Sequence, residues 1–204
     1  MNPRAHWRTV YRTKDPQRVS WYQERPSTSL RMIESAGLGP EARILDVGGG
    51  ATHLVDHLVE AGYRQVGVLD VAAEALSRSR QRLGDRAADV EWYASDVLAF
   101  ESPHPWDLWH DRAAFHFLTD PDDQARYRDV LHRSLAAGGQ AVIATFAPKG
   151  PERCSGLPVQ RYDAERLQDV LGPALRLAEH RFDVHVTPAG AEQEFLFARL
   201  VLTS

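Results

Sequence analysis

A glycine cluster follows an apolar run in the segment ILDVGGGATHLVDHLVEAGY, which begins at Ile44. Where a strand leads into a helix, glycines let the backbone take positive φ and let a ligand approach the main chain and the helix N-terminus. Gly48 and Gly50 supply a GxG pair, but His53 stands where the dinucleotide fingerprint has its third glycine. The cluster indicates a nucleotide-like ligand.

Acidic residues stand at or just after the ends of three successive apolar runs, and they indicate more closely which ligand could bind. Asp46 lies at the end of the first run, just before the glycines, and Asp70 ends the second. A carboxylate at the position of Asp70 can accept hydrogen bonds from both ribose hydroxyls. As an exposed group at a strand end, Asp70 is expected to contribute little to stability. Asp96, in the segment YASDV, could accept from the exocyclic amine of an adenine ring.

Short apolar runs that alternate with helical segments must position these groups. Strands are expected at 42–47, 65–70, 90–94, 106–111 and 140–146, and helices at 52–61, 72–83 and 121–137. A further helix is expected from Ser27, where hydroxyl side chains can cap it, to the glycines at 37 and 39. Strand and helix in alternation predict a parallel sheet with right-handed crossovers and helices on both faces.

The C-terminal part has a different pattern. The segments LRLAEHRFDVHVTP and EQEFLFARLVLT are extended and are separated by a Pro-Ala-Gly turn, so they predict an antiparallel hairpin at the edge of the sheet. The stretch 147–158 is rich in proline and glycine and is interpreted as a long loop above the strand ends. Residues 1–26 are interpreted as an irregular, basic arm.

Composition excludes several classes of protein. The chain has 204 residues, enough for one domain, of which 43% are apolar and 25% are charged. Its net charge of −4 does not favour binding to nucleic acid, which is itself negatively charged. The lone Cys154 excludes a disulfide framework and suits a reducing compartment. No signal peptide and no apolar run of roughly 20 residues is found, so a cytoplasmic protein without membrane partners is expected. His53 and His57 have helical metal-pair spacing, but no third ligand follows, and no metal is expected.

Taken together, these motifs resemble the class I S-adenosylmethionine-dependent methyltransferases. The matching segments are DVGGG (46–50), Asp70, SDV (95–97), WDLWHDR (106–112), LAAGGQAVI (135–143) and the final hairpin. The resemblance implies an α/β, Rossmann-like, doubly wound sheet of seven strands, mostly parallel with a C-terminal antiparallel hairpin. It also implies one domain over 27–204, preceded by the arm at 1–26, which would act as a lid. The activity implied is methyl transfer from S-adenosylmethionine to a small molecule or a protein side chain.

The resemblance also implies cofactor contacts. The glycines would approach the methionine part of the cofactor with Asp46 near its amino group, Asp70 would hold the ribose, and Asp96 the adenine. Trp21 of the arm would close over the bound molecule. The full set of implied cofactor residues is Asp46, Gly48, Gly49, Gly50, Thr52, Asp70, Val71, Asp96, Val97, Asp111 and Trp21. Thr52 replaces the third glycine of the usual run, where it can cap the helix.

Three residues are candidates for catalysis: Asp111, His116 and Tyr22. Asp111 would face the amino-acid end of the cofactor or the substrate. His116, in HDRAAFHFL, could deprotonate or orient an acceptor, or be a buried histidine held by backbone groups. Tyr22 could close the pocket together with Trp21, or the pair could anchor the arm. A general base is needed only for an acceptor that arrives protonated.

Candidates for acceptor contact lie on three segments: Arg112, His185, Gln193 and Cys154. The alternatives are polar edge-strand residues for the two hairpin positions and an inert buried thiol for the cysteine. The segments WYQ, HDRxxFHFL and CSGLPVxRY also resemble a bacterial group related to the lysine methyltransferases of elongation factor and citrate synthase, and more loosely to thiopurine methyltransferases. The first relation implies a protein lysine and the second a small thiol or chalcogen compound.

Asp111-Arg112-Ala113-Ala114 stands where the lysine enzymes typically carry a DKGT-like motif, which disfavours a lysine acceptor. Two other functions stay open at this point. An NAD-dependent oxidoreductase would need a third glycine at position 53 and no hairpin, and a non-catalytic S-adenosylmethionine-binding protein would lack turnover. A monomer or a homodimer is expected.

Overall fold

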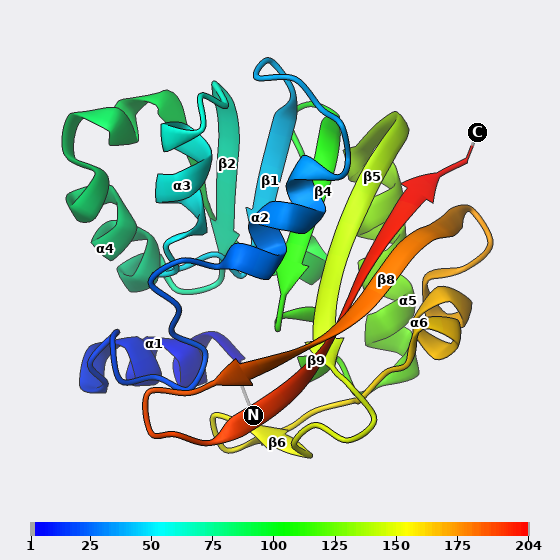
Figure 1. Cartoon of the computed structure of the whole chain (residues 1–204). Coiled ribbons are helices and arrows are strands. Elements are labelled where there is room, and N and C mark those ends of the chain that lie inside the picture. The colour runs from blue at the N-terminus through cyan, green and yellow to red at the C-terminus, as the bar shows by residue number, and fades with distance from the viewer. Residues whose placement is uncertain (1–2, 204) are drawn as a thin grey trace.

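A seven-stranded sheet runs through the computed structural model, which describes residues 3–203 (Figure 1). The strand order is β3-β2-β1-β4-β5-β9-β8. The strands are β1 Arg43–Val47, β2 Gln65–Asp70, β3 Val90–Ala94, β4 Trp106–Arg112, β5 Leu135–Phe146, β8 Leu175–Val186 and β9 Glu192–Leu202. The first five are parallel, whereas β9 is antiparallel to both β5 and β8. The predicted fold class, with its C-terminal hairpin, is confirmed.

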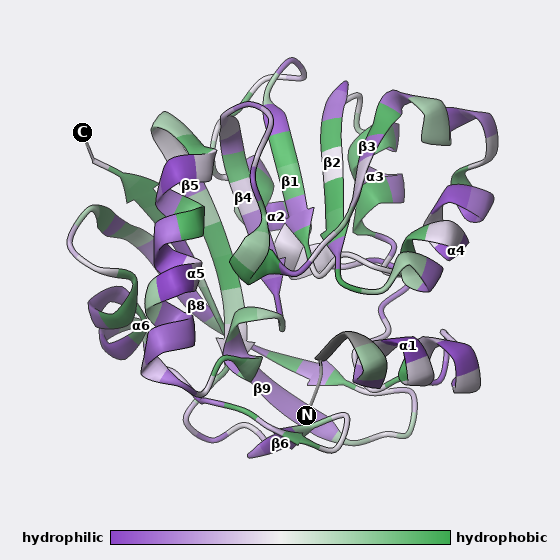
Figure 2. Ribbon diagram, turned by 180° about the vertical axis from the view of Figure 1, so that it is seen from behind, coloured by the Kyte–Doolittle hydropathy of each residue, from purple (hydrophilic) through white to green (hydrophobic). Residues whose placement is uncertain are grey.

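Helices cover both faces of the sheet (Figures 1 and 2). Side chains of α2, α3 and α4 share one buried cluster with the strands, and those of α5 and α6 share the other. The helices are α1 Pro3–Thr13, α2 Ser27–Glu34, α3 Leu54–Glu60, α4 Ala73–Leu83, α5 Pro121–Ser134 and α6 Ala164–Leu171. Short 3-10 turns are η1 Gly84–Asp89, η2 Val97–Ala99 and η3 Phe115–Phe117, and a small hairpin pairs β6 Arg153–Cys154 with β7 Leu157–Pro158.

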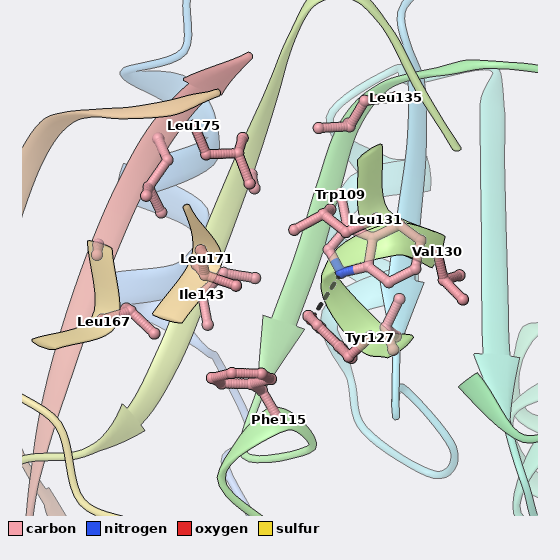
Figure 3. Close-up of a cluster of buried hydrophobic side chains, with 14 of the residues drawn as sticks. Trp109, Phe115, Tyr127, Val130, Leu131, Leu135, Ile143, Leu167, Leu171 and Leu175 are labelled. Carbon is pink, nitrogen blue, oxygen red and sulfur yellow. Dashed lines mark hydrogen bonds between the residues drawn. The ribbon is translucent and has the colours of Figure 1, made fainter. Parts of the chain in front are cut away.

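Buried aromatic residues fill the cluster between the sheet and α5 (Figure 3). The indole Nε1 of Trp109 donates a 2.9 Å hydrogen bond to the hydroxyl of Tyr127, so the one polar atom of each ring is paired. Phe115 packs on Tyr127 with ring centroids 4.6 Å apart. Each such side chain stabilises the fold by about 1.5–3 kcal/mol through burial, and this cluster fixes β4 against α5.

Packing against a neighbouring side chain requires a glycine at position 67, in the middle of β2. A Cβ at this position would lie 2.5 Å from Cη2 of Trp106, so any larger residue would displace that buried indole.

Two helices start where the sequence provides a carboxylate cap. Asp120 accepts from the backbone N–H of Asp122 at the start of α5, and Asp163 accepts from that of Arg166 at the start of α6.

The arm is not irregular, because its first part is the helix α1. Trp7, Val10 and Tyr11 recur at helical spacing and form the face that α1 turns toward the protein, where Val10 and Tyr11 are buried. The helix packs against α4, where Nε of Arg8 lies 2.8 Å from a carboxylate oxygen of Glu74. The prediction missed α1 because only these few apolar positions interrupt a polar sequence.

Three local predictions are wrong. The hydroxyls of Thr28 and Ser29 do not cap α2, since they bond instead to side chains of β8 and β4. Thr52 does not cap α3, which begins after His53 without a side-chain cap. The residues 135–137 belong to β5 rather than to α5, because the helix ends at Ser134. None of the described helices is long and apolar enough to cross a membrane.

Candidate functional site

A cavity of about 520 Å³ lies at the carboxyl ends of the parallel strands. Its walls come from the glycine loop after β1, the ends of β2 and β4, the turn after β3 and the β6–β7 segment. The N-terminal arm supplies the remaining wall, and Figure 1 shows α1 beneath the strand ends. Ligands of open α/β sheets bind at this edge, so the fold places the cavity where the sequence analysis expects the ligand.

The glycine loop is too crowded for side chains. Gly48 has φ +68°, and a Cβ there would lie 2.9 Å from Cβ of Ala114. A Cβ at Gly49 would lie 2.3 Å from a carboxylate oxygen of Asp46. Gly48 and Gly49 line the cavity, whereas Gly50 (φ +35°) is not part of its wall and packs beside Asp70 and Tyr11. The loop therefore presents its backbone to the cavity.

Asp46 is held by a neighbour that the sequence analysis missed. Oδ1 of Asp46 lies 2.8 Å from Nδ1 of His110, and Nε2 of His110 lies 2.9 Å from Oγ of Ser29. Thr52 Oγ1 is 3.5 Å from the other carboxylate oxygen of Asp46. All four residues line the cavity, so the carboxylate is fixed in orientation at its wall.

Asp70 is buried, contrary to the expectation of an exposed strand-end group. Only 6% of its surface is exposed, and its Oδ1 accepts a 2.7 Å hydrogen bond from the backbone N–H of Ala72. Burial raises the pKa of Asp70 to about 7, the bond from Ala72 lowers it, and the nearby charge of Asp46 raises it. Asp70 and the following Val71 both line the cavity. A buried carboxylate here costs stability when it is ionised.

Asp96 lies in the turn after β3 and also lines the cavity. Its Oδ1 accepts a 2.9 Å hydrogen bond from the backbone N–H of Leu98 and so caps η2. Val97 and Leu98 line the cavity beside it. The turn therefore offers a carboxylate and two apolar side chains to the same space.

Asp111 does not face the cavity. Its carboxylate is fully buried on the opposite face of β4, where it accepts from the hydroxyl of Tyr127 at 2.7 Å and from the backbone N–H groups of Ala114 and Phe115. Burial raises its pKa to about 6, against the lowering effect of these hydrogen bonds. Alternate residues of a strand point to opposite faces, so His110 and Arg112 face the cavity and Asp111 cannot. The hydrogen bonds of the Asp111 carboxylate to two backbone N–H groups hold the turn after β4 in place.

His116 is buried in η3 and is not part of the cavity wall. Its ring packs on Phe146, with centroids 4.7 Å apart, and neither ring nitrogen has a hydrogen-bond partner among the described residues. Burial, followed by the charge of Arg112, lowers its pKa to about 3. His116 is therefore neutral at physiological pH and does not reach an acceptor in this arrangement.

The arm contributes aromatic side chains to the cavity wall. Trp21 packs edge-on against Trp7, with centroids 5.7 Å apart, and Tyr22 packs edge-on against His53 at 5.6 Å. Trp7 and Tyr11 of α1 line the cavity as well. Sequence reasoning missed these two because α1 itself was missed, although their i, i+4 spacing was a signal.

Two of the four residues predicted to contact an acceptor line the cavity, namely Arg112 and Cys154. Burial raises the pKa of the Cys154 thiol. His185 and Gln193 face each other across the β8–β9 register but do not line the cavity. Nε2 of His185 donates a 2.7 Å hydrogen bond to the carbonyl of Ser20, so this histidine ties the arm to the hairpin.

A family model described as a methyltransferase domain matches residues 44–139, from β1 and its glycine loop into β5. This region of the chain is therefore similar to methyltransferase domains, and the seven-stranded sheet has the fold of the class I S-adenosylmethionine-dependent methyltransferases. This match and the β8–β9 hairpin disfavour the NAD-dependent oxidoreductase. Within residues 3–203, no group of three or more histidine, cysteine or acidic side chains is arranged to hold a metal ion.

One curated protein is similar to much of this chain. The chain is 26% identical over 147 residues to an eEF1A lysine and N-terminal methyltransferase of Danio rerio, a match that covers 70% of this chain but only 21% of that protein. The chain thus spans about a fifth of that curated relative.

Two solved N-methyltransferases share its fold. Both are 20% identical to this chain. One is NodS from Bradyrhizobium japonicum, in complex with S-adenosylhomocysteine, at a TM-score of 0.77 with all of both chains covered. The other is the 1,6-didemethyltoxoflavin-N1-methyltransferase of Burkholderia thailandensis, with bound 1,6-didemethyltoxoflavin and S-adenosylhomocysteine, at a TM-score of 0.76 with 98% of this chain and 87% of that chain covered.

Proposed function

We propose that this chain transfers the methyl group of S-adenosylmethionine to a small molecule that enters the same cavity as the cofactor. One observation carries the proposal: the cavity of about 520 Å³ is continuous from Asp70 and Asp96, on one side, to Arg112 and Cys154, on the other. Its volume lies in the range of about 300–1,000 Å³ that is typical of pockets for small ligands.

The side of the cavity near β2 and β3 suits a nucleoside. Asp70, when ionised, would accept hydrogen bonds from the two ribose hydroxyls, and Val71 would pack beside the sugar. Asp96 would accept from the amine of the adenine, with Val97 against the ring. The backbone of Gly48 and Gly49 would approach the methionine part, with Asp46 toward its ammonium group. All seven of these residues line the cavity.

The reaction makes modest demands on side chains. Methyl transfer is an in-line displacement in which the acceptor's lone pair forms the new bond as the carbon–sulfur bond breaks, and the sulfonium loses its charge. Positioning and exclusion of water therefore supply most of the rate. Trp7, Trp21 and Phe117 make the wall apolar, which favours loss of that charge. Tyr22 is the predicted catalytic residue that lines the cavity, and it would orient an acceptor.

A small acceptor fits the enclosure better than a protein side chain. The arm and the β6–β7 segment both contribute to the wall, through Trp21, Tyr22, Cys154 and Leu157, so the acceptor region lies behind two chain segments. The likeness to a protein methyltransferase keeps a protein lysine or N-terminus as the second candidate. A monomer or homodimer, a cytoplasmic location and the absence of nucleic-acid or membrane partners stay predictions.

The test uses the complete chain and S-adenosylmethionine labelled in its methyl group. Calorimetry with S-adenosylhomocysteine is expected to give a one-to-one complex, and incubation with a cell extract is expected to place the label in the small-molecule fraction. Label in protein would support the second candidate. Binding without transfer to any fraction would support a non-catalytic cofactor-binding protein, and a folded sample that binds no S-adenosylhomocysteine would contradict the proposal.

A further inference from the structure

Arg112, the last residue of β4, carries a guanidinium group with unused donors. Its Nη1 donates a 3.1 Å hydrogen bond to the carbonyl of Trp21. Nε and Nη2 are covered by protein atoms and have no hydrogen-bond partner among the described residues. The group lies 4.8 Å from the centroid of the Phe195 ring. The residue nevertheless lines the cavity.

The guanidinium also lacks a counter-ion in the part of the chain that the structure describes. No carboxylate there lies within 4.0 Å of it. The two carboxylates whose charge acts on it over longer distances are both engaged, Asp183 by the hydroxyl of Thr28 and Asp46 by His110. Burial lowers the pKa of Arg112 to about 10, so it still carries its charge at neutral pH.

A buried cation without an anion is costly, typically by several kcal/mol, and each unpaired donor adds to the cost. The neighbouring histidines do not share the charge. Burial, with the charge of Arg112 as a second cause, lowers the pKa of both His116 and His185. Arg112 is therefore a single positive charge at the cavity wall, and its Nε and Nη2 form the fork that matches the two oxygens of a carboxylate or phosphate.

The position of the fork separates it from the nucleoside side. Asp70 and Asp96 follow β2 and β3, on one side of β1 in the strand order, whereas Arg112 ends β4, on the other side of β1. Its guanidinium lies against Phe195 of β9, still farther from β2. Arg112 thus lies at the part of the cavity that the proposed function gives to the acceptor, and its covered Nε and Nη2 meet an acceptor only after a small shift of the side chain or of the arm.

We propose that Arg112 binds an oxyanion, a carboxylate or a phosphate, carried by the methyl acceptor. The acceptor is then a small anionic molecule with a nucleophilic atom elsewhere in its structure. This inference rests on the proposed function. Arg112 is a specificity residue in it, because an acceptor without the anion leaves the buried cation unpaired.

The first experiment separates the acceptor from the cofactor, whose methionine part also carries a carboxylate. Arg112→Met removes the charge at similar length. Calorimetry is expected to give an affinity for S-adenosylhomocysteine within about threefold of wild type. A loss of about tenfold or more would show that the cation serves the cofactor and would overturn the inference. Arg166→Met is the matched control, since Arg166 also lies over an aromatic ring, at 5.8 Å from the Tyr162 centroid, but outside the cavity wall.

The second experiment needs no knowledge of the acceptor and uses acetate as the probe. In protein saturated with S-adenosylhomocysteine, the Nε–H nuclear magnetic resonance signal of Arg112 is expected to shift saturably with acetate and to stay in place with neutral acetamide. Arg112→Lys keeps a charge but loses the fork, so acetate, followed in this variant through the backbone N–H signal of residue 112, is expected to bind more weakly than to wild type, which gives a second reading if Arg112→Met does not fold. A signal that acetate does not move would overturn the inference.

The third experiment examines the product of the extract assay. The labelled small molecule made by wild type is expected to bind an anion exchanger, and Arg112→Met is expected to make at least about tenfold less of it. A neutral or cationic product would overturn the inference while leaving methyl transfer to a small molecule intact. Wild-type protein that binds no S-adenosylhomocysteine would instead contradict the proposed function itself.

Discussion

Nδ1 of His110 lies 2.8 Å from Oδ1 of Asp46, and both side chains are 3% exposed. An ionised carboxylate can only accept, so Nδ1 of His110 donates to Asp46, and Nε2 pairs with the hydroxyl of Ser29. This chain of hydrogen bonds crosses from β1 to β4 and on to α2. It sets the orientation of the carboxylate that we assign to the cofactor's ammonium group.

His110→Leu is expected to lower the free energy of unfolding by about 3–5 kcal/mol, because it leaves a buried carboxylate unpaired. Ser29→Ala, at the far end of the same chain, is expected to cost about 1 kcal/mol. Urea unfolding followed by circular dichroism measures both. Equal effects of the two substitutions would mean that the His110–Asp46 contact does not carry the difference.

Affinity for S-adenosylhomocysteine is expected to fall as the pH drops below about 7. Burial raises the pKa of Asp70 to about 7, and only the ionised carboxylate accepts the ribose hydroxyl protons at full strength. Asp70→Asn is expected to weaken binding by about 10- to 100-fold and to remove this pH dependence. Calorimetry between pH 5.5 and 8.5 tests it. Asp96→Asn serves as the control, which should weaken binding but keep the dependence.

Without ligand, Asp70 is expected to reduce stability as the pH rises. Its pKa is raised in the folded state, so the folded protein holds this proton more tightly than the unfolded chain does. The stabilisation is complete below the ordinary pKa near 4 and is lost as the pH rises through about 7. Asp70→Asn should therefore raise the melting temperature at pH 8 and change it little at pH 4, where both forms are neutral. A substitution that lowers the melting temperature at pH 8 would contradict the burial argument.

Gly49→Ala is expected to weaken S-adenosylhomocysteine binding and to lower the free energy of unfolding by about 1–3 kcal/mol. The new Cβ would lie 2.3 Å from Oδ2 of Asp46 and 2.8 Å from Cγ1 of Val68, so the carboxylate must move. Gly39→Ala is the control, because nothing lies within 4 Å of a Cβ there and its φ is not positive. Chemical unfolding and calorimetry on both variants test the steric argument, which fails if the two behave alike.

The strands could be predicted from the sequence more accurately than the site. β2 and β3 begin and end where their apolar runs do. In β2 the reason is burial on both faces, which leaves a continuous apolar signal. The site depends on side-chain direction, which motif spacing does not contain. Asp111 was chosen from its motif, yet the alternation along β4 turns it toward Tyr127 and turns His110 and Arg112 toward the cavity.

Other features could not be predicted because they depend on contacts between distant segments. His116 is a plausible base in sequence, but Phe146, from β5, covers its ring. Asp70 looks exposed at a strand end, but the arm helix and the glycine loop bury it, and Tyr11 and Gly50 both lie close to its carboxylate. The direction of a pKa shift follows from such burial and not from the residue type.

The arm is held to the rest of the protein largely through its own backbone. Arg78 donates to the carbonyl of Tyr11, His185 to that of Ser20, and Arg112 to that of Trp21. The last of these contacts joins the arm to the residue that we assign to the acceptor. Displacement of the arm for exchange of S-adenosylhomocysteine would therefore also release the guanidinium of Arg112. We expect cofactor release and acceptor recognition to be kinetically coupled through this one hydrogen bond. Movement of the arm is then expected to be the rate-limiting step of turnover.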